Sequence, residues 1–165
     1  MAQNDQALLI RLKESGLDFA VIGGVCVVYH GAGLATFDLD ICCRFNMDNV
    51  KRIDSAVQDL HPVHRLTANK LPLEMTRSSF GDLKNLYLQT DLGKLDCLGE
   101  VAGIGGYDQV LARSVLAKFP HGDFHFLDLD ALIASKEAAG RDKDLYALRL
   151  LHCIKERNEQ QKKIM

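Results

Sequence analysis

Two aspartates that lie one residue apart, shortly after a pair of glycines, are the feature that most constrains this chain. The glycines are Gly23 and Gly24, and the aspartates are Asp38 and Asp40. On a strand, alternate side chains share a face, so the two carboxylates point the same way. Carboxylates this close repel one another unless a cation lies between them. Mg²⁺, or Mn²⁺ in its place, prefers such oxygen ligands together with substrate phosphates, so the pattern predicts metal-assisted phosphate chemistry.

The composition indicates a single globular domain. The chain has 165 residues and a net charge of -2, so no overall basic field would attract nucleic acid or an anionic membrane. No apolar run is as long as a membrane span, and the start has no signal-peptide core, so we expect no membrane partner. The five cysteines lack the paired CxxC spacing of a zinc site. We therefore expect buried free thiols and a cytoplasmic location.

Hydrophobic spacing and breaker residues predict a mixed order of helices and strands. Helices are expected over 6–13, 25–32, 47–60, 107–112, 128–140 and 142–157, and strands over 19–22, 36–43, 62–66, 86–88, 95–97, 115–119 and 124–127. The β-branched residues of 25–32 leave a strand as the alternative there. Asp48 or Asn49 is expected to cap the third helix, residues 67–80 to be irregular, and the polar tail 156–163 to fray. Mixed α and β elements with some consecutive strands predict a mixed sheet.

The glycine pair has two readings. Glycines between a strand and a helix let the backbone approach a phosphate closely, and the helix start offers free N–H groups to it. A turn without any ligand is an equally ordinary role for Gly23 and Gly24. Their spacing matches neither the GxGxxG fingerprint of dinucleotide-binding folds nor the GKS or GKT of a P-loop.

The remaining polar candidates also have ordinary alternatives. Asp96 lies on a later strand and, taken alone, could be a surface acid beside Lys94. Lys136, Arg141 and Lys143 occur on amphipathic helices, where solvated charges are common. The six histidines form no recognisable ligand set, so we expect them at or near the surface.

Taken together, these residues resemble the nucleotidyltransferase superfamily with the polymerase-β type of palm. The residues that carry the resemblance are Gly23, Gly24, Thr36, Asp38, Asp40, Asp96, Lys136 and the segment 141–144. The chain looks most similar to small bacterial nucleotidyltransferases, including the AbiE toxin branch and antibiotic nucleotidyltransferases. This resemblance implies an α+β (mixed α/β) fold, with a mixed sheet flanked by helices and short C-terminal helices. Residues 1–127 would form the core, and 128–165 a helical extension packed on the same domain.

The resemblance also implies an activity, which is metal-dependent transfer of NMP from an NTP to an acceptor hydroxyl on a small molecule, RNA or protein. Asp38, Asp40 and Asp96 would be the catalytic carboxylates and would hold Mg²⁺ or Mn²⁺. The nucleoside triphosphate would be bound by Gly23, Gly24, Thr36, Lys136 and Lys143.

One departure from the resemblance leaves alternatives open. Relatives often carry arginine two residues before the threonine, where this chain has Leu34. An inactive nucleotide-binding or regulatory module of the same fold is therefore one alternative. A homodimer in which a neighbouring chain closes the site is another. A toxin–antitoxin or stress role is suggested only by analogy between folds.

Overall fold

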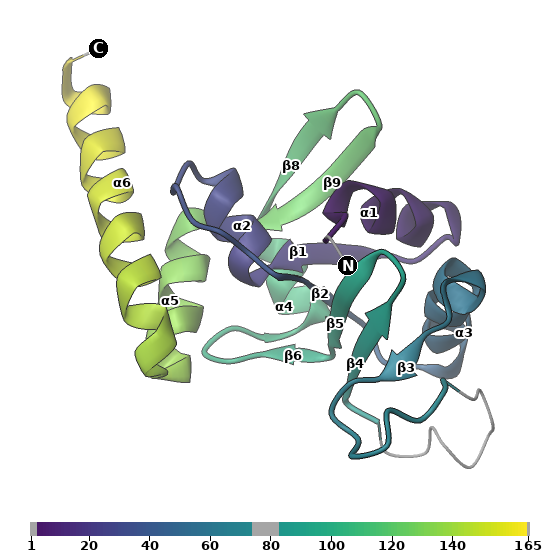
Figure 1. The fold of residues 1–165 in the computed structure, drawn as a ribbon. Coiled ribbons are helices and arrows are strands. Elements are labelled where there is room, and N and C mark those ends of the chain that lie inside the picture. Colours follow the sequence, from purple (N-terminus) through teal and green to yellow (C-terminus); the bar gives the residue numbers. More distant parts are fainter. Residues whose placement is uncertain (1–2, 74–82, 165) are drawn as a thin grey trace.

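A seven-stranded mixed sheet forms the centre of the computed structural model, which describes residues 3–73 and 83–164 (Figure 1). Its strand order is β3-β4-β5-β2-β1-β9-β8. These strands are β1 (Phe19–Ile22), β2 (Asp38–Cys43), β3 (Val63–His64), β4 (Asn85–Thr90), β5 (Gly93–Leu98), β8 (Ser114–Phe119) and β9 (Gly122–Leu127). The central strand β2 runs antiparallel to β1 and parallel to β5, which makes the sheet mixed, as predicted.

Helices pack against this mixed sheet, which confirms the predicted fold class. They are α1 (Asp5–Glu14), α2 (Gly23–Tyr29), α3 (Met47–Val57), α4 (Tyr107–Ala112), α5 (Leu129–Ala139) and α6 (Leu145–Ile164), with 3-10 turns at Gln58–Leu60 and Asp142–Asp144. In Figure 1, α5 and α6 lie together at one side of the molecule, and α1 and α3 lie at the other. None of the helices in the described part of the chain is long and apolar enough to cross a membrane.

The two faces of β2 divide the core from the polar side of the sheet. Leu39 and Ile41 are fully buried, whereas Asp38 and Asp40 alternate with them and are half-buried. All four residues of the neighbouring strand β1 are buried. The predicted alternation is therefore confirmed, and it fixes which side chains line the polar face.

Helix ends account for most of the wrong predictions. The segment after β1 is a helix rather than a strand, but it begins at Gly23, two residues before the predicted start. The cap of α3 is Asn46, whose side chain accepts a hydrogen bond from the Asn49 backbone at 2.9 Å, so Asp48 and Asn49 were the wrong candidates. The tail does not fray, because α6 continues to Ile164. Its last turns are rich in Glu, Gln and Lys, which favour helix, and they contain no glycine or proline.

Short strands were predicted less well than long ones. The predicted strand over 62–66 is reduced to the two residues of β3, and the small hairpin of β6 (Glu100–Val101) and β7 (Gly105–Gly106) was missed. Strands of two residues are too short to show alternation, which explains both errors. Of the segment 67–80, which was predicted to be irregular, residues 74–80 lie outside the described residues. The division between 1–127 and 128–165 stays a prediction.

Four of the five cysteines are buried free thiols, as predicted, and one is exposed. The buried four are Cys26, Cys42, Cys43 and Cys97, and the exposed one, Cys153 on α6, is also free. Burial raises the pKa of Cys42 and Cys43 to about 12, so these thiols stay protonated near neutral pH. Because the thiolate is the reactive form, the buried thiols are expected to react slowly.

A thiol reagent should therefore modify one cysteine rapidly in the native protein and all five after denaturation. The reaction can be followed by absorbance, and Cys153→Ser should abolish the rapid phase because that thiol alone is exposed in the described structure. Rapid modification of two or more thiols in the native state would contradict the burial of the other four.

Candidate functional site

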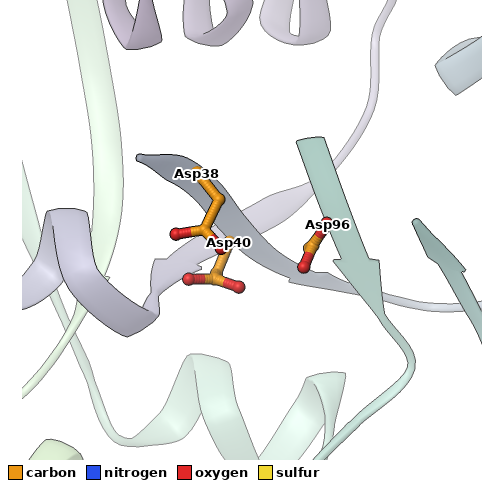
Figure 2. A group of neighbouring side chains, drawn as sticks. All are labelled: Asp38, Asp40 and Asp96. Carbon is orange, nitrogen blue, oxygen red and sulfur yellow. The ribbon is translucent and has the colours of Figure 1, made fainter. Parts of the chain in front are cut away.

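Three carboxylates meet on the polar face of the sheet (Figure 2). Asp38 and Asp40 project from β2, and Asp96 projects from the parallel neighbour β5. Asp40 and Asp96 are register partners, and one carboxylate oxygen from each of the three residues lies within 4.8 Å of the others. The structure therefore brings together the three acids that were singled out from the sequence.

The glycine pair makes room for this cluster. Gly23 has a φ of +63°, and a Cβ atom there would lie 2.0 Å from Oδ2 of Asp40. A Cβ atom on Gly24 would lie 2.6 Å from the hydroxyl of Thr36, which itself donates a hydrogen bond to the Asp38 carbonyl at 3.0 Å. Only glycine lets the start of α2 approach both side chains this closely. The backbone of Gly24 also lies close enough to the Asp40 carboxylate to favour its charged form.

Burial and crowding raise the pKa values of Asp40 and Asp96. Burial, together with the charges of Asp38 and Asp96, raises the pKa of Asp40 to about 7, although the Gly24 backbone and Lys136 oppose the shift. Burial also raises the pKa of Asp96 above its ordinary value. A divalent cation would relieve this repulsion, and three oxygen donors on one face are the ligands that such a cation prefers. The donor set thus fits Mg²⁺ or Mn²⁺.

Arg65 was not among the residues chosen from the sequence, yet it contacts the cluster. It follows β3, and its guanidinium forms two hydrogen bonds to Asp96, one of them from Nε to Oδ1 at 3.0 Å. Arg65 therefore places a positive charge beside the cluster from the turn after β3, whereas Leu34 at the cleft offers none. The prediction of a strand end near Arg65 was the only sequence signal, and it did not show that β3 joins the sheet beside β4 and β5.

Lys136 is the second cation near the carboxylates. This lysine of α5 is only 7% exposed, and its ammonium donates to Asp144 Oδ1 at 2.9 Å. Arg141 donates to the other oxygen, Oδ2, at 2.6 Å. Although burial opposes it, these hydrogen bonds hold the pKa of Asp144 below its ordinary value. The ion-paired Asp144 thus fixes where Lys136 lies.

All of these groups except Gly23 line one cleft of about 390 Å³. Its lining includes the predicted residues Gly24, Thr36, Asp38, Asp40, Asp96, Lys136 and Lys143, together with Leu34, Arg65, Tyr87, Arg141 and Asp144. Lys143 is exposed at this cleft. A second cleft, of about 340 Å³, lies between α1, α4 and β9 and contains none of the three clustered carboxylates.

Comparison with solved structures identifies the fold. The solution structure of the antibiotic-resistance factor ANT(2'')-Ia matches with a TM-score of 0.55 and 11% identity, over 96% of this chain and 90% of that chain. This chain has the nucleotidyltransferase fold. A crystal structure of ANT(2'')-Ia in complex with adenylyl-2''-tobramycin matches with the same TM-score of 0.55 and 13% identity, over 88% of this chain and 83% of that chain. No protein-family model and no curated protein sequence matches this chain.

The raised pKa of Asp40 predicts a pH dependence of stability in the metal-free protein. The folded state holds the Asp40 proton up to about pH 7, whereas the ordinary pKa of aspartate is 3.8. The stabilisation from this proton is therefore present near pH 4 and is lost as the pH rises to about 7. Asp40→Asn removes the titration, so the unfolding free energy of the wild type relative to this variant should fall across that interval.

Denaturant unfolding in the presence of a chelator, repeated at several pH values, measures this difference. Asp48→Asn, at an exposed position on α3, is the matched control and should keep the wild-type pH profile. A constant difference between Asp40→Asn and the wild type from pH 4 to 8 would contradict the prediction.

The buried ion pair of Lys136 predicts a large effect on stability. Asp144→Ala leaves the ammonium of Lys136 buried without its carboxylate, so the variant should lose about 3–5 kcal/mol of unfolding free energy. Denaturant unfolding measures the loss. Asp142→Ala, at an exposed neighbour in the same 3-10 turn, should cost much less. Equal losses in the two variants would mean that the pair is not important for folding.

Proposed function

We propose that this protein is a metal-dependent nucleotidyltransferase that transfers NMP from an NTP to an acceptor hydroxyl. The observation that supports this most strongly is the convergence of Asp38, Asp40 and Asp96 within 4.8 Å in a chain with the nucleotidyltransferase fold. Fold alone does not imply activity, so the carboxylate cluster carries the argument.

In this proposal, Asp38, Asp40 and Asp96 hold Mg²⁺ or Mn²⁺. Such cations, when bound, neutralise the charge that develops on the attacking and leaving oxygens of the transferred phosphoryl group. The side chains themselves fix the position of the reacting groups, which contributes much of the remaining acceleration. Asp96, on the strand nearer to β4, orients the acceptor hydroxyl or removes its proton.

The triphosphate is assigned to the basic side of the same cleft. Lys136 and Lys143 both line the cleft and would neutralise the charge of the departing pyrophosphate. Gly23, Gly24 and Thr36 would bind the phosphates at the start of α2, beside the Asp40 carboxylate that Gly23 admits. The new bond joins the acceptor oxygen to the α-phosphorus as the bond to pyrophosphate breaks.

The identity of donor and acceptor is a narrower proposal. Because ANT(2'')-Ia was observed with an adenylylated small molecule, ATP and hydroxyl-bearing small molecules are the first pair to test, followed by RNA and protein acceptors. A cytoplasmic location, a toxin–antitoxin role and a homodimer that closes the cleft also remain hypotheses. Measurement of molecular mass in solution tests the last of these.

Pyrophosphate release tests the activity. Wild-type protein with labelled NTPs, Mg²⁺ and pools of acceptors should release pyrophosphate. The rate of pyrophosphate release by Asp38→Asn should be lower by more than about 100-fold, because even indirect changes at metal sites lower activity by up to that much. Asp123→Asn, at an exposed position on β9, should keep the wild-type rate. Nucleotide binding without release in any pool would instead support the inactive module suggested by Leu34.

A further inference from the structure

The guanidinium of Arg65 lies against Asp96, one of the three clustered carboxylates. It hydrogen-bonds to both oxygens of Asp96, through Nε to Oδ1 at 3.0 Å and through Nη2 to Oδ2. The side chain of Asp96 is 7% exposed and that of Arg65 is 22% exposed, so water screens the pair only weakly. Two parallel hydrogen bonds to one carboxylate are the strongest form of this contact.

Arg65 contacts the ring of Tyr87 at the same time as the carboxylate of Asp96. Its backbone N–H donates to the Tyr87 carbonyl at 3.0 Å, and its guanidinium lies over the Tyr87 ring, 5.5 Å from the centroid. Tyr87 is the register partner of Asp96 on the adjacent strand β4. The aromatic face can stabilise a guanidinium that has left the carboxylate. Such a shift requires only a side-chain movement, because the backbone of Arg65 is held by the sheet.

A divalent cation shared by all three aspartates must compete with this contact. Both oxygens of Asp96 already accept hydrogen bonds from a positive group, and like charges repel at such short range. Neither Asp38 nor Asp40 carries a comparable ion pair among the described residues. The two carboxylates of β2 are therefore the more available ligands.

We propose that Arg65 is an internal counter-cation that competes with the metal for Asp96. Asp38 and Asp40 would hold a first divalent cation, and Asp96 would join them only when the Arg65 guanidinium moves off its carboxylate. Arg65 thereby keeps the third carboxylate out of the metal site until a bound cation displaces it. This inference rests on the proposed function, because it takes the carboxylate cluster to be a metal site.

The opposite role for Arg65 predicts a change in metal affinity of the opposite sign when the arginine is removed. If Arg65 positioned Asp96 for the metal, its removal would weaken metal binding, as the loss of a supporting partner ordinarily does. If Arg65 competes, its removal strengthens binding. The sign of the change in metal affinity therefore separates the two roles without any activity measurement.

Titration of the metal-free protein with Mn²⁺ alone, followed by electron paramagnetic resonance at pH 8, tests the proposal. Arg65→Gln should bind Mn²⁺ about tenfold more tightly than the wild type, a change of the size that carboxylate partners exert on metal sites. Arg65→Lys, which keeps the positive charge, should show a smaller increase in Mn²⁺ affinity. Arg11→Gln is the matched control, because Arg11 forms the same two-bond contact with Asp59 away from the cleft, at 2.8 and 2.9 Å.

Each outcome decides between the possibilities. Unchanged or weaker Mn²⁺ binding by Arg65→Gln, with binding by the wild type intact, overturns the competition and leaves the metal site standing. Absence of Mn²⁺ binding in all variants overturns the metal site and the competition together. If Arg65→Gln is unfolded without metal because the acids repel, addition of Mn²⁺ should refold it. Circular dichroism should show this refolding at a lower Mn²⁺ concentration than the one at which the wild-type protein binds the metal. Failure to refold would count against the proposal.

Discussion

Repulsion among three carboxylates on adjacent strands is the constraint to which the rest of the cleft responds. The parallel register of β2 and β5 places Asp40 directly beside Asp96, and the alternation of β2 adds Asp38 on the same face. Removing these charges from water is costly, which is why the pKa of Asp40 rises to about 7. The amide of Gly24, the guanidinium of Arg65 and the ammonium of Lys136 each offset a part of that cost. A divalent cation would offset more of it than any of them.

The cations around the cluster are themselves held in place by other groups. Lys136 is fixed by Asp144, which Arg141 also contacts, and Arg65 is fixed between Asp96 and the ring of Tyr87. A buried ion pair of this kind adds little net stability compared with apolar packing, but removal of one partner is costly. The pairs are better explained by geometry than by stability, since they set where positive charge lies along the cleft.

Local patterns predicted most of this structure, and long-range pairing explains what they missed. The buried strand Phe19–Ile22 and the alternation of Asp38 and Asp40 are encoded by neighbouring residues, so both were predicted. Arg65 was missed because its contact with Asp96 depends on the pairing of β3 with β4 and of β4 with β5. No spacing within one segment reports such a relation. The cap at Asn46 was missed for a smaller reason, since Asn46, Asp48 and Asn49 lie close together and each could have capped α3.

Charge balance in the cleft links these observations to the proposed chemistry. Its described lining carries four carboxylates and four basic side chains, namely Asp38, Asp40, Asp96 and Asp144 against Arg65, Lys136, Arg141 and Lys143. Divalent cations alone would leave this lining with an excess of positive charge, and a triphosphate alone would leave it negative. Each ligand therefore favours the binding of the other, as expected where metal ions bridge the phosphates of a nucleotide. Under the proposed function, an arginine that moves off Asp96 when the cations arrive would couple the third carboxylate to the presence of the nucleotide.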